Sequence, residues 1–329
     1  MKGVFLTGGT GYLGASLAAG LAAGGAEVVA LVRDPGRAPS LPKGVRAVPG
    51  DVTDIESIRR GMKGCDRAVH AAAHVRAWDR DPGRFEAVNV GGLLNVIRAA
   101  EEAGLSRVLY TSSFIALGPT DGQVADEDWT LPRRRFHNLY EKTKALGDEV
   151  ARREARRGAP LVVLYPGVLY GPGPLTPGNL VGKTIRDFVA GRIPGILGRG
   201  DRRICYAYLP DVVQGHLRAL HSARDGERFI LGGENRTLLE VFQEMERITG
   251  VASPRRHIPY SLARAAGWLQ RWRAVLTGAE PEITDEIVEI YRHEWAYSSS
   301  RAEDRLGYRI TSLATGLEAT VRELGVGKP

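Results

Sequence analysis

Residues 5–21 read FLTGGTGYLGASLAAGL and form the stretch that decides the fold. An apolar segment runs directly into closely spaced glycines, and an alanine- and leucine-rich helical pattern follows at once. Gly8, Gly11 and Gly14 are each three residues apart, while Gly9, Gly11 and Gly14 fit the related spacing G-x-G-x-x-G. Glycines between a strand and a helix let the backbone approach a pyrophosphate, whose charge the helix N-terminus stabilises. The stretch therefore predicts a dinucleotide-binding turn.

Short apolar segments alternate with helical patterns through the first half of the chain. The strand candidates are 3–8, 27–32, 45–51, 67–73, 107–113 and 161–167. Continuous apolar strands separated by helices are typical of a parallel sheet that is covered on both faces. With right-handed crossovers, this pattern predicts an α/β fold of the Rossmann type, with a doubly wound parallel sheet.

The alternation ends where proline and glycine become dense, through residues 171–200. We predict a dinucleotide-binding domain over 1–170 and a smaller, mixed α/β substrate-binding domain over 171–329. A strand at 205–213 and the helix after it are expected to return to the main sheet. Part of 203–225 would then complete the first domain.

Composition and charge argue against several classes of function. No apolar run in the 329 residues approaches the length of a membrane span, and glycines interrupt the first apolar segment where a signal peptide needs its hydrophobic region. The net charge is +7, but the arginines are scattered and form no stripe with aromatic residues for nucleic acid. Cys65 and Cys205 have no partner spacing and are expected to be buried free thiols. We expect a cytoplasmic protein without metal, nucleic-acid or membrane partners.

The residues after the second strand candidate bear on which dinucleotide binds. An NAD site needs an acidic residue at the end of this strand for the ribose hydroxyls, but that position is Val32, followed by Arg33. A guanidinium suits a 2′-phosphate, and Arg37 could add a second cation. Asp34 argues for NAD(H), because its carboxylate could accept hydrogen bonds from the ribose hydroxyls. On balance NADP(H) is favoured, and NAD(H) stays the alternative. Asp51, at the end of the third strand, could accept from an adenine amino group.

Seven motifs together resemble the extended, or atypical, short-chain dehydrogenase/reductases of the NAD-dependent epimerase/dehydratase superfamily. They are TGGTGYLG (7–14), GDVTD (50–54), VHAAA (69–73), NVGG (89–92), YTSSFIALG (110–118), YEKTK (140–144) and YPGVLYGPG (165–173). Each motif alone is weak evidence, but their common order and spacing make the set specific. The resemblance implies a Rossmann fold and an oxidoreductase that uses a nicotinamide dinucleotide.

The resemblance also implies a catalytic set. In that family a Tyr and a Lys four residues apart act with a hydroxyl group at the end of the fifth strand. Carried over, these are Tyr140, Lys144 and Ser113, with Ser112 as the competing hydroxyl and Asn89 as a further member. A free phenol has a pKa of about 10, and a nearby ammonium lowers it by stabilising the phenolate. Ser113 would hold the substrate oxygen.

Further cofactor contacts follow from the resemblance alone. With the residues already introduced, the expected set is Gly8, Thr10, Gly11, Tyr12, Leu13, Gly14, Arg33, Asp51, Val52, Ala71, Ala72, Ala73, Tyr140, Lys144, Tyr165, Pro166, Gly167 and Val168. The same likeness implies a homodimer, since family members often pair through the helix that bears the catalytic Tyr.

Other polar residues near these motifs have simpler explanations. Residues 141–143 are expected on the exposed surface of their helix. His70 is expected to be a structural histidine whose hydrogen bonds are satisfied. His74, Arg76 and Trp78 lie in a loop where the family gathers substrate contacts, and a plain surface loop is the equal alternative.

Two subclasses of the family compete. One comprises nucleotide-sugar epimerases and dehydratases with tightly bound NAD(P); the other comprises carbonyl reductases resembling dihydroflavonol 4-reductase and the 3β-hydroxysteroid dehydrogenases. Arg33 favours the reductases, and Ile204 stands where many nucleotide-sugar enzymes place a diphosphate-binding Arg, with Arg203 one residue away. We predict an NADP-dependent carbonyl reductase or secondary-alcohol dehydrogenase for a small, partly apolar substrate. A non-catalytic NADP-sensing regulator is the remote alternative, disfavoured because Tyr140 and Lys144 are both present.

Overall fold

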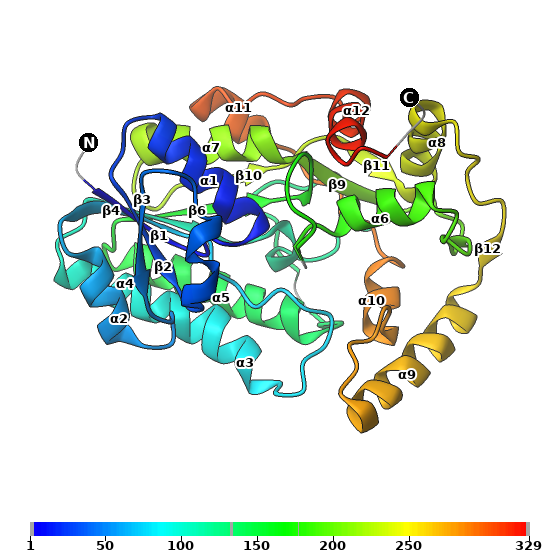
Figure 1. Ribbon diagram of the computed structural model, residues 1–329, viewed down its shortest axis with the longest axis horizontal. Coiled ribbons are helices and arrows are strands. Elements are labelled where there is room, and N and C mark those ends of the chain that lie inside the picture. The colour runs from blue at the N-terminus through cyan, green and yellow to red at the C-terminus, as the bar shows by residue number, and fades with distance from the viewer. Residues whose placement is uncertain (1–2, 132–133, 177, 327–329) are drawn as a thin grey trace.

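Seven parallel strands form the central sheet, in the order β10-β6-β5-β4-β1-β2-β3 (Figure 1). The computed structural model describes residues 3–131, 134–176 and 178–326. The strands are β1 (Gly3–Thr7), β2 (Val28–Val32), β3 (Val45–Pro49), β4 (Cys65–His70), β5 (Arg107–Thr111), β6 (Leu161–Pro166) and β10 (Arg228–Leu231). The strand order reverses between β1 and β4, and in such sheets ligands bind at the carboxyl ends of the strands beside this point. The expected doubly wound fold is confirmed.

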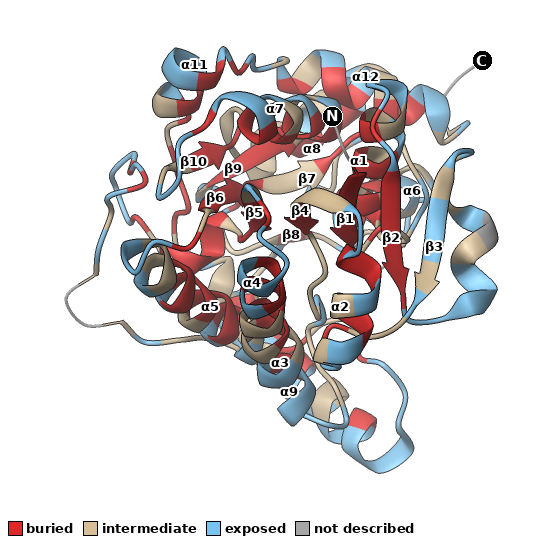
Figure 2. Cartoon of the chain, turned by 90° about the vertical axis from the view of Figure 1, so that its left-hand side faces the viewer, coloured by how far each residue is buried: buried red, intermediate tan, exposed pale blue. Residues whose placement is uncertain are grey.

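Helices cover both faces of this sheet. One face packs against α2 (Ile55–Met62), α4 (Gly92–Glu102) and α5 (Leu139–Arg156), and the other against α1 (Tyr12–Ala23), α7 (Leu209–Ser222) and α11 (Ser300–Leu306). Figure 2 shows the inner strands buried, whereas β3 at the edge is partly exposed. Strands covered on two faces need apolar side chains at every position, which explains the continuous apolar runs.

Two small sheets lie beyond the main sheet. Strands β7 (Val168–Tyr170), β9 (Arg203–Tyr208) and β11 (Asn235–Thr237) form one, and β8 (Ile196–Leu197) pairs with β12 (His257–Ile258) in the other. Helices α6 (Leu180–Val189), α8 (Leu238–Thr249) and α12 (Leu313–Glu323) pack around β7, β9 and β11 (Figure 1).

The expectation that a strand at 205–213 returns to the main sheet is wrong. That strand, β9, pairs with β7 and β11, because the free edge of β6 is taken by β10. Residues 209–213 are helical instead: Pro210 lies in the first turn of α7, where a missing N–H costs nothing. Helix α7 does pack on the main sheet, beside α1.

A helix pair projects from the body of the molecule. Figure 1 shows α9 (Tyr260–Thr277) and α10 (Asp285–Ile290) extending together below the small sheets. None of the helices in the described ranges is both long enough and apolar enough to cross a membrane. Both cysteines are free; Cys205 is buried and Cys65 is partly buried.

Candidate active site

The turn from β1 to α1 can be built only with glycine at two positions. Gly8 has a φ of +77°, and a Cβ there would lie 2.7 Å from the backbone nitrogen of Ala72. At Gly14 a Cβ would lie 2.0 Å from the carbonyl oxygen of Gly8. A Cβ on Gly11 would come near one atom only, the carbonyl oxygen of Gly8, at 3.2 Å. The turn is therefore open on the side of Gly11.

The N-terminus of α1 suits an anion. Gly11 is the N-cap, no side chain of the described chain caps the helix, and its first turn contains no acidic residue. The first N–H groups of a helix need external acceptors, and the helix dipole favours negative charge there. The turn therefore fits the pyrophosphate of a dinucleotide, with Gly8, Thr10, Gly11, Tyr12, Leu13 and Gly14 around it.

The segment after β2 contains two arginines, and one of them contacts this turn. Arg37 donates from Nη2 to the carbonyl oxygen of Thr10 at 2.8 Å. Arg33 is exposed, with its Nε 4.0 Å from Oδ2 of Asp51. Asp34 is used locally, because its Oδ1 accepts the backbone N–H of Gly36 at 3.0 Å and caps a short 3₁₀ helix. Asp34, the carboxylate that argued for NAD(H), thus has a structural role in this segment.

Asp51 and Val52 follow β3 beside the same edge. Asp51 Oδ1 accepts from the backbone N–H and the hydroxyl of Thr53, at 2.9 and 2.8 Å. Val52 is buried against α4, where a Cβ on Gly92 would lie 2.8 Å from its Cγ2. The N-cap of α2 is Asp54, so Asp51 is not needed for capping.

Ser113 and Tyr140 lie together at the carboxyl end of β5. Burial raises the pKa of Tyr140 to about 12, and the nearby Ser113 hydroxyl acts in the opposite direction. Ser112, directly after β5, is buried; its backbone N–H donates to the carbonyl oxygen of Leu164 at 2.8 Å, and its hydroxyl has no partner in the described chain. The hydroxyl that contacts the phenol is therefore that of Ser113.

Lys144 lies one helical turn from Tyr140 and is 2% exposed. Its Nζ donates to the carbonyl oxygen of Thr111 at 3.1 Å and lies 5.5 Å from the centre of the Tyr110 ring. Burial lowers the pKa of Lys144 to about 7. The expected lowering of the phenol pKa by a full ammonium is not found in this state, because burial dominates at both residues.

This burial predicts a specific pH dependence of stability. Lys144 has a folded pKa of about 7 and an ordinary value of 10.5, so between these values the unfolded chain holds the proton and the folded chain releases it. The free energy of unfolding of the cofactor-free protein should therefore rise by about 2 kcal/mol from pH 7 to pH 9 through this group. The Lys144→Met variant should lack this rise in urea titrations. An unchanged difference between the two proteins across this pH range would contradict the prediction.

Asn89 connects the catalytic helix to the loop after β4. It lies in a π-helical turn (Ala87–Gly91) between α3 (Gly83–Glu86) and α4, and it is 2% exposed. Its Oδ1 accepts the backbone N–H of His74 at 2.7 Å, and its Nδ2 donates to the hydroxyl of Thr143 at 2.9 Å. Thr143 in turn donates to the carbonyl oxygen of Leu139 at 2.9 Å. Asn89 thus positions the helix that carries Tyr140.

The expectation of an exposed surface at residues 141–143 holds for Lys142 and is wrong for its neighbours. Glu141 and Thr143 are buried. Glu141 Oε2 accepts the backbone N–H of His137 at 2.8 Å, and its Oε1 lies 3.2 Å from Nη2 of Arg134. That guanidinium also donates to the carbonyl oxygens of residues 115 and 116, just after Ser113.

The sequence carried a signal for Glu141. Asn138 is the N-cap of α5 and accepts the backbone N–H of Glu141 at 2.8 Å. An Asn followed three residues later by Glu is the pattern of a helix start in which both side chains face the chain before the helix. Glu141 and Arg134 together fix the segment that precedes Tyr140 against the end of β5.

His70 is buried in a structural environment, but the expectation that its hydrogen bonds are satisfied is only half met, because its Nε2 has no hydrogen-bond partner in the described chain. It is 1% exposed, and its Nδ1 lies 2.8 Å from the hydroxyl of Thr7. That hydroxyl also accepts the backbone N–H of Ala72 at 3.2 Å. Burial lowers the pKa of His70 to about 3, so the ring is neutral. The pair fixes Ala71, Ala72 and Ala73 beside the glycine turn.

Two tyrosines of the expected cofactor set have their hydroxyls engaged elsewhere. Tyr165 is fully buried and donates to Oδ1 of Asp148 at 2.5 Å. Tyr12 donates to the carbonyl oxygen of Gly171 at 2.7 Å. Tyr165 and Pro166 end β6, Gly167 links the two strands, and Val168 begins β7.

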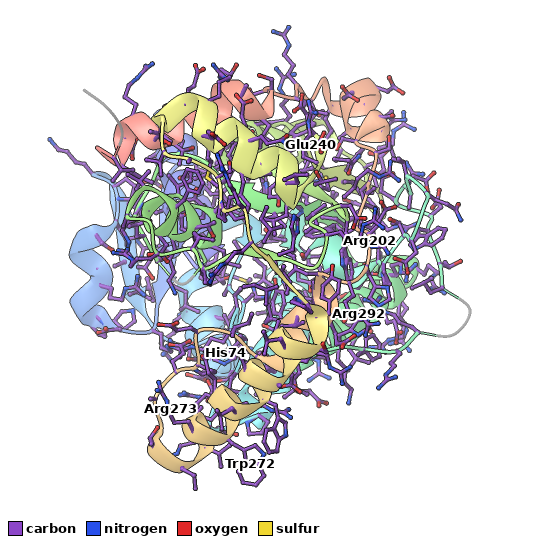
Figure 3. The ribbon with its side chains drawn as sticks, turned by 90° about the vertical axis from the view of Figure 1, so that its right-hand side faces the viewer. His74, Arg202, Glu240, Trp272, Arg273 and Arg292 are labelled. Atoms are coloured by element: carbon purple, nitrogen blue, oxygen red, sulfur yellow. The ribbon has the colours of Figure 1, made fainter. Side chains whose placement is uncertain are left out.

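The loop after Ala73 is fixed at both ends. His74 Nε2 lies 2.8 Å from Oδ2 of Asp79, and its ring packs edge-on against Phe85 at 4.7 Å (His74 is labelled in Figure 3). Arg76 Nη1 lies 3.4 Å from Oε1 of Glu280, just beyond α9. Trp78 is partly buried between these contacts. The loop therefore connects the candidate site to the projecting helix.

Comparisons with known proteins agree with this arrangement. A profile of the "NAD dependent epimerase/dehydratase family" matches residues 4–232. A Synechocystis sp. protein named as a candidate dihydroflavonol 4-reductase is 31% identical over 327 residues, covering 96% of this chain and 93% of that protein. Sterol demethylase protein B of Methylococcus capsulatus is 35% identical over 311 residues, with 93% of each chain covered.

A solved structure extends the agreement to the fold. The UDP-glucose 4-epimerase of Thermus thermophilus, in complex with NAD, superposes with a TM-score of 0.77 at 23% identity and covers 98% of both chains. The family profile spans well over half of this chain, and both relatives exceed 30% identity over nearly all of it. The chain therefore belongs to the NAD dependent epimerase/dehydratase family, as an extended short-chain dehydrogenase/reductase and an NAD(P)-dependent oxidoreductase.

Proposed function

We propose that this protein is an NADP(H)-dependent carbonyl reductase, working reversibly as a secondary-alcohol dehydrogenase. The observation that carries the proposal is that the Ser113 hydroxyl lies near the Tyr140 phenol at the carboxyl end of β5, with Lys144 one helical turn away on α5. These groups lie at the same edge of the sheet as the glycine turn of β1. A ketone oxygen between the two hydroxyls would face a proton donor and a second hydrogen-bond donor together.

The roles of the three side chains follow from their environments. The reduced nicotinamide, when bound, supplies the hydride to the carbonyl carbon. Tyr140 gives its phenolic proton to the carbonyl oxygen, and its raised pKa keeps the phenol protonated at neutral pH. Ser113 donates to the same oxygen as negative charge develops there. Lys144, with a pKa of about 7, can hold or release a proton near neutrality and so supports reprotonation of the phenol.

The segment after β2 supports NADP(H) over NAD(H). Arg33 is exposed near Asp51, Arg37 is hydrogen-bonded to Thr10 of the glycine turn, and Asp34 caps the short 3₁₀ helix. A 2′-phosphate needs cations at this position, whereas a ribose diol needs a free carboxylate.

The small sheet supports a reductase over a nucleotide-sugar enzyme. Ile204 is buried in β9, at the position where a diphosphate-binding arginine would be expected. The neighbouring Arg203 forms two hydrogen bonds with Glu294, from Nε at 3.1 Å and from Nη2 at 3.0 Å. This paired guanidinium is not free to bind a diphosphate.

The proposal is tested by following the absorbance of NADPH and NADH separately against a panel of carbonyl compounds. The panel should include dihydroflavonols, 3-ketosteroids and simple ketones. NADPH should be consumed with a hydrophobic ketone, and NADH much more slowly. Epimerisation of nucleotide sugars without net change in the cofactor would overturn the reductase assignment. Tight NADP binding without turnover of any substrate would instead support the alternative of a non-catalytic NADP-sensing regulator.

Two other expectations stay predictions. A homodimer is expected from the resemblance, and the cytoplasmic location from the sequence. Size-exclusion chromatography with light scattering measures the first directly.

A further inference from the structure

Helix α9 has one packed side and one open apolar side. Ala263, Gly267 and Ala274 are buried, and a Cβ on Gly267 would lie 2.4 Å from the backbone nitrogen of Asp285 in α10. The opposite side carries large apolar side chains that are each at least half exposed. They are Leu262, Trp268, Leu269, Trp272, Val275 and Leu276. Figure 3 shows Trp272 pointing away from the body at the outer end of the helix.

The charged residues of the segment that carries this apolar side are all basic. Residues 251–279 contain five arginines and no acidic residue. Arg264 and Arg271 pair with carboxylates of α10. In the part of the chain that the structure describes, no carboxylate lies within ion-pair distance of Arg255, Arg256 or Arg273. Figure 3 shows Arg273 near the same end of α9 as Trp272.

This combination fits an anionic lipid surface. Tryptophan and leucine on one side of a helix, flanked by arginine, are typical of helices that lie in the boundary between headgroups and acyl chains. Anionic headgroups attract such arginines. A second copy of the chain would bring the same unpaired cations together, so it is the weaker partner. We propose that α9 binds the surface of membranes that contain anionic lipid.

The position of α9 gives this binding a consequence for the substrate. Just beyond its C-terminal end, Glu280 lies 3.4 Å from Arg76, and a Cβ on Gly278 would lie 3.8 Å from the guanidinium of Arg80. Both arginines belong to the loop that follows Ala73 and is fixed to Asn89 through His74. A ketone dissolved in lipid would therefore reach the enzyme beside its candidate active site. This step rests on the proposed function and names its substrate class as water-insoluble ketones or alcohols.

The sequence led us to expect no membrane partner, because no apolar run is long enough to span a membrane. A helix that lies on the surface needs no such segment, since its outer side alone enters the lipid.

Vesicle binding tests the proposal directly. The full chain is sedimented with vesicles of phosphatidylcholine alone and with vesicles that also contain phosphatidylglycerol. Binding should require the anionic lipid and shift the tryptophan emission to shorter wavelength. The Leu269→Glu/Trp272→Glu variant should bind at least ~10-fold more weakly, because it places two charges in the apolar side. Leu180→Glu, an equally exposed leucine on α6, is the matched control and should bind like the wild type.

Three outcomes would overturn the proposal. They are no binding to the anionic vesicles, equal binding by the double variant, and loss of self-association in the double variant without vesicles. The last outcome would assign the apolar side to a second copy.

A kinetic comparison separates this proposal from the proposed function. With a water-soluble ketone the double variant should keep the wild-type kcat and KM, since α9 touches none of the catalytic groups. With a ketone carried in anionic vesicles its KM should rise roughly 10-fold while kcat stays unchanged. If neither protein reduces any ketone but vesicle binding differs as expected, the proposed function fails and the membrane site remains.

Discussion

Replacing Tyr140 by Phe should lower kcat for ketone reduction by about a thousandfold while leaving the affinity for NADPH nearly unchanged. The substitution removes one hydroxyl group and keeps the ring, so the packing around the start of α5 is retained. The lost group is the phenolic hydroxyl that lies near Ser113. Stopped-flow measurement of NADPH oxidation gives kcat, and fluorescence titration gives the cofactor affinity.

The neighbouring hydroxyls provide the controls for this result. Ser113→Ala should also lower kcat, whereas Ser112→Ala should leave it close to wild type, because the Ser112 hydroxyl is buried and has no hydrogen-bond partner in the described chain. Circular dichroism melting should show that all three variants are folded. Activity retained by Tyr140→Phe would refute its role as the acid and turn attention to Lys144.

The sequence was most informative where local geometry and chemistry coincide. The glycine turn was predictable because Gly8 and Gly14 occupy positions that a Cβ cannot enter. The inner strands were predictable because burial on two faces imposes continuous apolar runs. The pair Tyr140 and Lys144 was predictable because a spacing of four places two side chains on one face of a helix.

The remaining features depend on contacts between distant segments. Strand β9 is largely buried, like an inner strand, yet it pairs with β7 and β11, while β10 occupies the edge of β6. Glu141 has a polar side chain and was expected to be exposed, yet Arg134 and the backbone of His137 satisfy it inside the protein. The apolar side of α9 looks like an ordinary amphipathic pattern until the structure shows that its buried side is the one with small residues.

Cofactor selection offers the other large effect. Arg33 and Arg37 lie at the carboxyl end of β2, and neither forms an ion pair shorter than 4.0 Å in the described chain. Removing both should therefore leave stability nearly unchanged. Each charge-assisted hydrogen bond to a phosphate contributes about 1.5–3 kcal/mol.

The Arg33→Ala/Arg37→Ala variant should consequently raise the KM for NADPH by roughly 100-fold while the KM for NADH changes little. Arg46→Ala is the matched control, since Arg46 is an exposed arginine near the opposite, amino end of β3. If the effect came from a general loss of positive charge, both variants would bind both cofactors more weakly. If Arg33 and Arg37 bind the 2′-phosphate, only the double variant should bind NADPH more weakly, and its affinity for NADH should be unchanged. Equal losses for NADPH and NADH, or a wild-type preference for NADH, would show that these guanidiniums do not read the 2′-phosphate. The difference between the two cofactors is one phosphate group, so the ratio of the two KM values isolates what that group gains from this edge of the sheet.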